Sequence, residues 1–183
     1  SWESSVHYER IINTEVRRRL GGTHSADLLI RSYDFAAIER LQESGDWEAA
    51  GALLAEDARL LQQAGADLIV LCTNTMHRVA GAIEAAVDIP FLHLGDAVAG
   101  AIRNAGLGRV GLLGTRYTME QPFLIDRLGS HGIDVVVPEP ADREIVHRVI
   151  FEELVRGRIE RASRRHYVEI VERLVERGAE GVV

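Results

Sequence analysis

The single cysteine of the chain stands in a run of small polar residues that follows an apolar stretch. Residues 68–71 are continuously apolar, which predicts a strand buried on both faces. Residues 75–86 carry an apolar stripe at helical spacing and predict a helix. Cys72 lies in the turn between them, where an open parallel α/β sheet binds its ligands. We therefore expect Cys72 to lie at a ligand site.

The residues around this cysteine suit a bound carboxylate. The Thr73 hydroxyl, the Asn74 amide and the Thr75 hydroxyl or N–H are donors near the positive end of the predicted helix. The electrostatic field at the positive end of this helix predicts a lowered pKa for the Cys72 thiol and a larger thiolate fraction. The alternative is that Cys72 is a buried, inert side chain and that Thr75 only caps the helix.

A second polar turn follows the strand predicted over residues 109–113. Thr115 and Arg116 come directly after that strand, and Thr118 is expected to cap the next helix. A solvated loop is the alternative for Arg116. His147 and Arg148, near the start of a later helix, have the reach to enter the same crevice, although a surface role fits each of them better when taken alone.

The composition excludes several functions. The chain has 183 residues, a net charge of −7 and no basic block, which argues against nucleic acid and anionic membrane surfaces as partners. No apolar run approaches the length of a membrane span. All 21 basic residues are arginine, so no lysine in this stretch can form a Schiff base with pyridoxal phosphate. One cysteine excludes an internal disulfide framework and favours a cytoplasmic location.

The remaining elements predict an α/β protein. A first helix is predicted by the four-residue spacing of Tyr8, Ile12, Val16 and Leu20, and the glycines at 21 and 22 end it. Helices and short apolar strands alternate after it, with a first visible strand over residues 26–33, a helix capped by Asp34, and a helix capped by Asp96 later. The last predicted helix carries Tyr167, Ile170, Val171 and Leu174 on its apolar face. Residues 61–70 resemble residues 174–183, each being a helix end, a glycine and a strand. We expect two similar Rossmann-like lobes with parallel central sheets, the first over residues 1–94 and the second over residues 95–183.

Four segments together resemble the aspartate/glutamate racemase family. They are residues 1–4 (SWES), 71–77 (LCTNTMH), 111–121 (GLLGTRYTMEQ) and 152–154 (EEL). The resemblance implies a cofactor-independent, dimeric racemase of two pseudo-symmetric three-layer α/β/α lobes with the substrate in the cleft between them. It also implies a two-base mechanism in which two cysteines flank the α-carbon, one as thiolate base and one as thiol acid.

Carried over residue by residue, the resemblance assigns catalysis to Cys72 and the substrate carboxylate to Thr73, Asn74 and Thr75. Thr115 matches the polar turn of the second lobe, and Gln42 matches a substrate-side position. We include Arg148 among the substrate-binding candidates. No metal site is expected. The family's opening strand and its second cysteine are expected before Ser1 and beyond Val183.

The predicted function is therefore racemisation of an acidic amino acid, aspartate or glutamate, by a cytoplasmic homodimer that needs no cofactor. One alternative is an enzyme of the maleate isomerase or decarboxylase type that acts on a small dicarboxylate. Another is a non-catalytic binding protein for acidic amino acids. A purely structural interaction module is the least favoured, because the sequence shows no exposed apolar docking face.

Overall fold

The computed structural model describes residues 2–183 and confirms a mixed α/β fold with parallel sheets. The chain divides into two compact units, Ser1–Leu92 and His93–Val183. No helix within residues 2–183 combines the length and the apolar character needed to cross a membrane.

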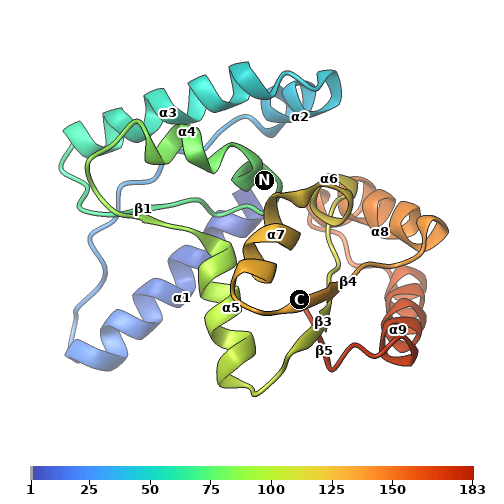
Figure 1. Cartoon of the computed structure of the whole chain (residues 1–183). Coiled ribbons are helices and arrows are strands. Elements are labelled where there is room, and N and C mark those ends of the chain that lie inside the picture. The colour runs from blue at the N-terminus through green and yellow to red at the C-terminus, as the bar shows by residue number, and fades with distance from the viewer. Residues whose placement is uncertain (1) are drawn as a thin grey trace. The chain divides into compact units, whose positions relative to one another are not determined.

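The first unit packs a short parallel sheet against α2, α3, η1 and α4, which lie together in Figure 1. Strands β1 and β2 pair in parallel, with Ile69 opposite Phe91. A 3₁₀ helix, η1, and the short helix α4 follow β1 where the sequence predicts one continuous helix. The elements are α1 (Trp2–Leu20), α2 (Phe35–Ser44), α3 (Trp47–Gln63), β1 (Ile69–Val70), η1 (Thr75–Val79), α4 (Ala80–Glu84) and β2 (Phe91–Leu92).

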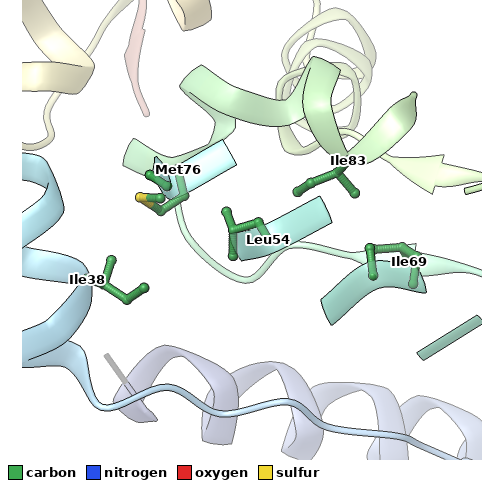
Figure 2. Close-up of a cluster of buried hydrophobic side chains, with 7 residues drawn as sticks. Ile38, Leu54, Ile69, Met76 and Ile83 are labelled. Carbon is green, nitrogen blue, oxygen red and sulfur yellow. The ribbon is translucent and has the colours of Figure 1, made fainter. Parts of the chain in front are cut away.

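The core of this unit lies between these helices and β1. Figure 2 shows Ile38 of α2, Leu54 of α3, Ile69 of β1, Met76 of η1 and Ile83 of α4 in one buried cluster. The helix α1 contributes no fully buried residue, although its prediction from the spacing of its apolar residues is confirmed. Cys72 is therefore positioned by β1 and η1, both of which are anchored in the core.

The prediction of a strand over residues 26–33 is wrong. This segment is irregular, and no backbone–backbone hydrogen bond joins residues 27–33 to any other part of residues 2–183. The Ala26 N–H instead donates to the Asn13 side chain at 2.9 Å. A strand is defined by its ladder partner, and apolar composition alone does not supply one.

The second unit is a three-layer arrangement around a parallel sheet in the order β4-β3-β5. One buried cluster packs α5 and α7 against the sheet, and a second packs α8 and α9 against it, so the two helical pairs cover opposite faces (Figure 1). The elements are α5 (Leu94–Asn104), β3 (Arg109–Gly111), α6 (Arg116–Glu120), α7 (Pro122–Ser130), β4 (Asp134–Val136), α8 (Pro140–Glu152), η2 (Leu154–Arg156), α9 (Arg161–Glu176) and β5 (Gly181–Val182).

Of the three predicted helix caps, Asp34 is confirmed, whereas Asp96 and Thr118 are wrong. Asp34 caps α2 as predicted, accepting from the Ala36 N–H at 3.2 Å. The cap of α5 is His93, whose Nδ1 accepts from the Gly95 N–H at 3.0 Å. Asp96 instead accepts hydrogen bonds from Arg127 and His131, which draw its carboxylate toward α7.

The repeat between residues 61–70 and 174–183 is also a structural repeat. The Ala66 N–H donates to the Leu61 carbonyl at 3.1 Å, and the Ala179 N–H donates to the Leu174 carbonyl at 3.0 Å. The intervening glycines have positive φ angles of 101° and 89°, the conformation that ends a helix. The same helix-to-strand connection, which we call the joint, therefore leads into β1 in the first unit and into β5 in the second.

Candidate active site

Cys72 lies at the centre of a three-residue turn at the carboxyl end of β1. The Thr73 N–H donates to the Leu71 carbonyl at 2.9 Å, which closes the turn around the cysteine. Within residues 2–183 no residue other than glycine has a positive φ, so this is the unstrained inverse form of the turn. The thiol is half-buried and belongs to no disulfide.

His77 fixes the next peptide of this loop. A carbonyl oxygen only accepts, so the 2.6 Å contact between His77 Nδ1 and the Thr73 carbonyl places a proton on Nδ1. The His77 ring is buried and packs against Phe91, with centroids 5.8 Å apart. The position of Thr73 is thereby coupled to β2 as well as to β1.

A cavity of about 740 Å³ within the first unit brings three of the predicted site residues together. Cys72, Thr73 and Gln42 line it, together with Tyr8. The Gln42 amide donates to the Met76 sulfur at 3.2 Å, which holds the side chain under the loop.

The other two residues of the predicted carboxylate loop do not line this cavity. Asn74 is exposed and makes no side-chain cap to η1. Thr75 is buried. The side chains of the four residues from Cys72 to Thr75 therefore do not all face the same cavity.

The prediction of a lowered thiol pKa is wrong for the structure as it stands. Burial raises the pKa of the Cys72 thiol above its ordinary value. The segments after it, η1 and α4, have five residues each, so neither provides the long aligned helix that the prediction assumed. Burial also raises the pKa of Tyr8, and a charge on Cys72 raises it further.

In the second unit, the cap of α6 is Thr115 and not Thr118 as predicted. The Thr118 N–H donates to Thr115 Oγ1 at 3.3 Å, and the two hydroxyl oxygens are 3.2 Å apart. Thr118 is completely buried, and Gly114 packs directly on it. A Cβ added at Gly114 would lie 2.9 Å from Thr118 Cβ, so the turn that presents Thr115 is tightly packed.

His147 contacts this turn, and its neighbour Arg148 does not. The Arg116 N–H donates to His147 Nδ1 at 3.1 Å. Arg148 is exposed on α8, and its side chain makes no hydrogen bond or ion pair with any residue in the part of the chain that the structure describes. We included Arg148 and not His147 among the substrate-binding candidates, but the two residues are adjacent on one helical turn and no local signal separates them.

Two contributors, Tyr8 and His77, escaped the sequence analysis, and a third, His147, was given a surface role there. Tyr8 was interpreted only as part of the apolar stripe of α1, yet it lines the cavity beside Cys72. His77 stands four residues after Thr73, a spacing at which side chains reach back along a helical turn, and this signal was available. His147 was named as able to reach the crevice, but its contact with Arg116 depends on the packing of α8 on α6, which no local pattern encodes.

The site offers a thiol, hydroxyls and amides but no grouped metal ligands. No three His, Cys, Asp or Glu side chains within residues 2–183 come together so as to hold a metal ion. A thiol with hydroxyl and amide donors nearby has the chemistry of proton transfer beside a bound anion.

Comparison with known proteins identifies the class of protein to which this chain belongs. A family model described as Asp/Glu/hydantoin racemase matches residues 1–183. A candidate Asp/Glu racemase of known structure from Yersinia pestis is 50% identical, with a TM-score of 0.91, over 100% of this chain and 80% of that chain. An aspartate racemase homologue from Pyrococcus horikoshii is 35% identical, with a TM-score of 0.79, over 98% of this chain and 78% of that chain.

An aspartate racemase from Picrophilus torridus is 20% identical, with a TM-score of 0.72, over 98% of this chain and 74% of that chain, and supports the fold alone. Together with the α/β fold, these matches define the class as racemases, which are isomerases. The chain belongs to the Asp/Glu/hydantoin racemase family.

Proposed function

We propose that this protein is a cofactor-independent racemase of an acidic amino acid, aspartate or glutamate, in which Cys72 transfers the α-proton. The supporting observation is that the family match extends over residues 1–183 and that the one cysteine is held on a tight turn at a strand end, beside a cavity. The names of two structural neighbours, an aspartate racemase homologue and a candidate Asp/Glu racemase, favour an acidic substrate.

The reaction needs a base on one face of the α-carbon and an acid on the other. In the proposed direction the Cys72 thiolate takes the α-proton, breaking the C–H bond and leaving its electron pair on the substrate as a carbanion. A second thiol then donates a proton to the opposite face. Substrate and product differ only in configuration, so the exchange balances without an oxidant or reductant.

We propose that the second thiol comes from the polypeptide beyond Val183. The structural repeat supports this, because Val182 of β5 is the counterpart of Ile69 of β1. Cys72 follows Ile69 by three residues, so its counterpart falls two residues past Val183.

The small polar residues of the two turns supply the proposed substrate contacts. Thr73, with Asn74 and Thr75 after it, would hold the substrate carboxylate in the first unit through hydroxyl and amide donors. Thr115 is the proposed contact in the second unit. Gln42 and Arg148 are further proposed contacts, Gln42 because it lines the cavity with Cys72 and Arg148 because its guanidinium is exposed and carries no ion pair within residues 2–183.

The test is α-proton exchange in D2O, followed by NMR, with both enantiomers of aspartate and of glutamate. The protein at its natural length is compared with Cys72→Ser and with a matched surface variant, Ser25→Ala, in an exposed segment. We expect exchange with racemisation of one acid, a loss of about 10²–10⁴-fold in Cys72→Ser, and no change in Ser25→Ala.

Two outcomes would contradict the proposal. Unchanged turnover in Cys72→Ser would remove the cysteine from the mechanism. Binding of an acidic amino acid without any exchange would indicate a non-catalytic binding protein.

A further inference from the structure

The first peptide of α6 is held by a side chain from α8. The Arg116 N–H is one of the helix-start donors that have no partner within the helix, and it donates to His147 Nδ1 at 3.1 Å across 31 residues of sequence. Thr118 N–H, two residues later, is satisfied by Thr115 Oγ1. Side chains therefore accept from two of the first three N–H groups of α6.

This contact fixes the protonation state of the imidazole. A backbone N–H only donates, so His147 Nδ1 is an acceptor and carries no proton, which makes the ring neutral with its proton on Nε2. A protonated ring would oppose the Arg116 N–H with a second donor, and the contact would be lost.

The ring is held in place on both sides. It lies edge-on to Tyr117, with centroids 6.2 Å apart, and packs on Phe151 at 4.7 Å. The charged groups that act on it are Arg116 and Glu120 on α6 and Glu144 on α8.

Of these groups, Arg116 and Glu144 pair with each other at 3.3 Å. Burial first, and the Arg116 charge second, hold the pKa of His147 below its ordinary value, although Glu144 and Glu120 act in the opposite direction. At neutral pH the neutral form required by the contact therefore predominates.

We propose that His147 is a positioning residue that holds the 114–117 turn, and with it Thr115, in the geometry in which Thr115 contacts the substrate. This inference rests on the proposed function for the part that concerns substrate. The ring contacts the backbone N–H of Arg116, the residue after Thr115, so its proposed role is to orient the turn and not to exchange a proton with the substrate.

Two substitutions separate the acceptor from the packing. His147→Asn keeps an acceptor oxygen close to the position of Nδ1 but removes the ring contacts with Tyr117 and Phe151. His147→Leu keeps an apolar side chain against both rings but removes the acceptor. His166→Asn, at an exposed position of α9, is the matched control.

Two readouts are measured on each variant of the protein at its natural length. The first is the hydrogen exchange of the Arg116 amide by NMR. We expect fast exchange in His147→Leu, and protection in His147→Asn, His166→Asn and the unsubstituted protein. The second is KM and kcat for the acidic amino acid that the enzyme racemises, as a function of pH.

In the kinetic measurement we expect His147→Leu to raise KM about tenfold with a smaller change in kcat. The reason is that this variant loses the hydrogen bond from the Arg116 N–H, and one hydrogen bond corresponds to a factor of about this size. His147→Asn should keep KM within about threefold and lose the rise in KM that protonation of His147 causes at acid pH in the unsubstituted protein.

The opposite order, with KM kept in His147→Leu and lost in His147→Asn, would show that His147 acts through packing and would overturn the proposal. An Arg116 amide that stays protected in His147→Leu would overturn it without reference to substrate. Should the unsubstituted protein racemise no acidic amino acid, the proposed function fails, and the Arg116 amide still decides whether His147 holds the turn.

Discussion

Gly114 sets the packing of the turn that carries Thr115, and its substitution by alanine gives a quantitative test. The new Cβ would lie 2.9 Å from both Cβ and Cγ2 of Thr118. Thr118 Cβ is attached directly to the backbone of α6 and the side chain is completely buried, so the strain cannot be relieved by rotating a flexible end. Either the 114–117 turn or α6 has to move.

The expected magnitude has two parts. Overpacking of a buried site costs about 1–3 kcal/mol. Alanine also restricts the unfolded chain, which favours folding by about 0.4–1 kcal/mol. We therefore expect Gly114→Ala to lower the free energy of unfolding by between about 0 and 2.6 kcal/mol. The matched control is Gly100→Ala within α5, where the new Cβ meets nothing within 4 Å and helix propensity predicts a gain of about 0.5–1 kcal/mol.

The assay is urea unfolding followed by far-UV circular dichroism. Both tryptophans, Trp2 and Trp47, belong to the unit Ser1–Leu92, so tryptophan fluorescence would report on the other unit. A Gly114→Ala protein as stable as Gly100→Ala would refute the argument that the turn is sterically fixed. Destabilisation accompanied by a raised KM is expected, since the same shift displaces Thr115.

Three further predictions concern the thiol, an exposed carboxylate and the core. Because burial raises the pKa of Cys72, kcat/KM should keep rising with pH above the ordinary thiol pKa, and a plateau reached below that pKa would contradict the structure. Glu180 accepts hydrogen bonds from the Gly108 and Arg109 N–H groups, which hold its pKa below the ordinary value, so it stabilises the fold above its unfolded pKa and this contribution is lost as the pH falls through the folded pKa. Glu180→Gln should therefore lower Tm at neutral pH and weaken the acid dependence of Tm, and equal acid dependence in both proteins would contradict this assignment. Leu174→Ala should cost about 2–5 kcal/mol in urea unfolding, because Leu174 is 1% exposed, and a cost below about 1 kcal/mol would show that the cluster between α9 and the sheet is loosely packed.

The sequence predicted the elements whose signals are local. The apolar spacing of α1 and α9, the Asp34 cap and the position of Cys72 at a strand end can all be derived from neighbours along the chain. The failures depend on distant partners. Residues 26–33 have strand composition but no ladder partner in the part of the chain that the structure describes.

Competing contacts explain the other failures. Asp96 is a good capping residue by type, but the guanidinium of Arg127 outcompetes a neutral backbone N–H for its carboxylate. The thiol pKa was predicted from a helix field alone, and the burial of Cys72 acts in the opposite direction. In each case the deciding interaction joins residues that are far apart in sequence, or depends on how much solvent reaches the group.

The shared joint that leads into β1 and β5 has an evolutionary meaning. Its two copies keep the same leucine, glycine and alanine, at Leu61 or Leu174, Gly65 or Gly178, and Ala66 or Ala179, while the three residues between leucine and glycine all differ. The glycine is suited to the positive φ of this connection, and each leucine packs on the core of its unit, while the alanine N–H donates to the leucine carbonyl in both copies. Duplication of an ancestral half-chain would leave such a pattern, in which both copies keep the geometry of the joint and differ in the residues between its leucine and its glycine.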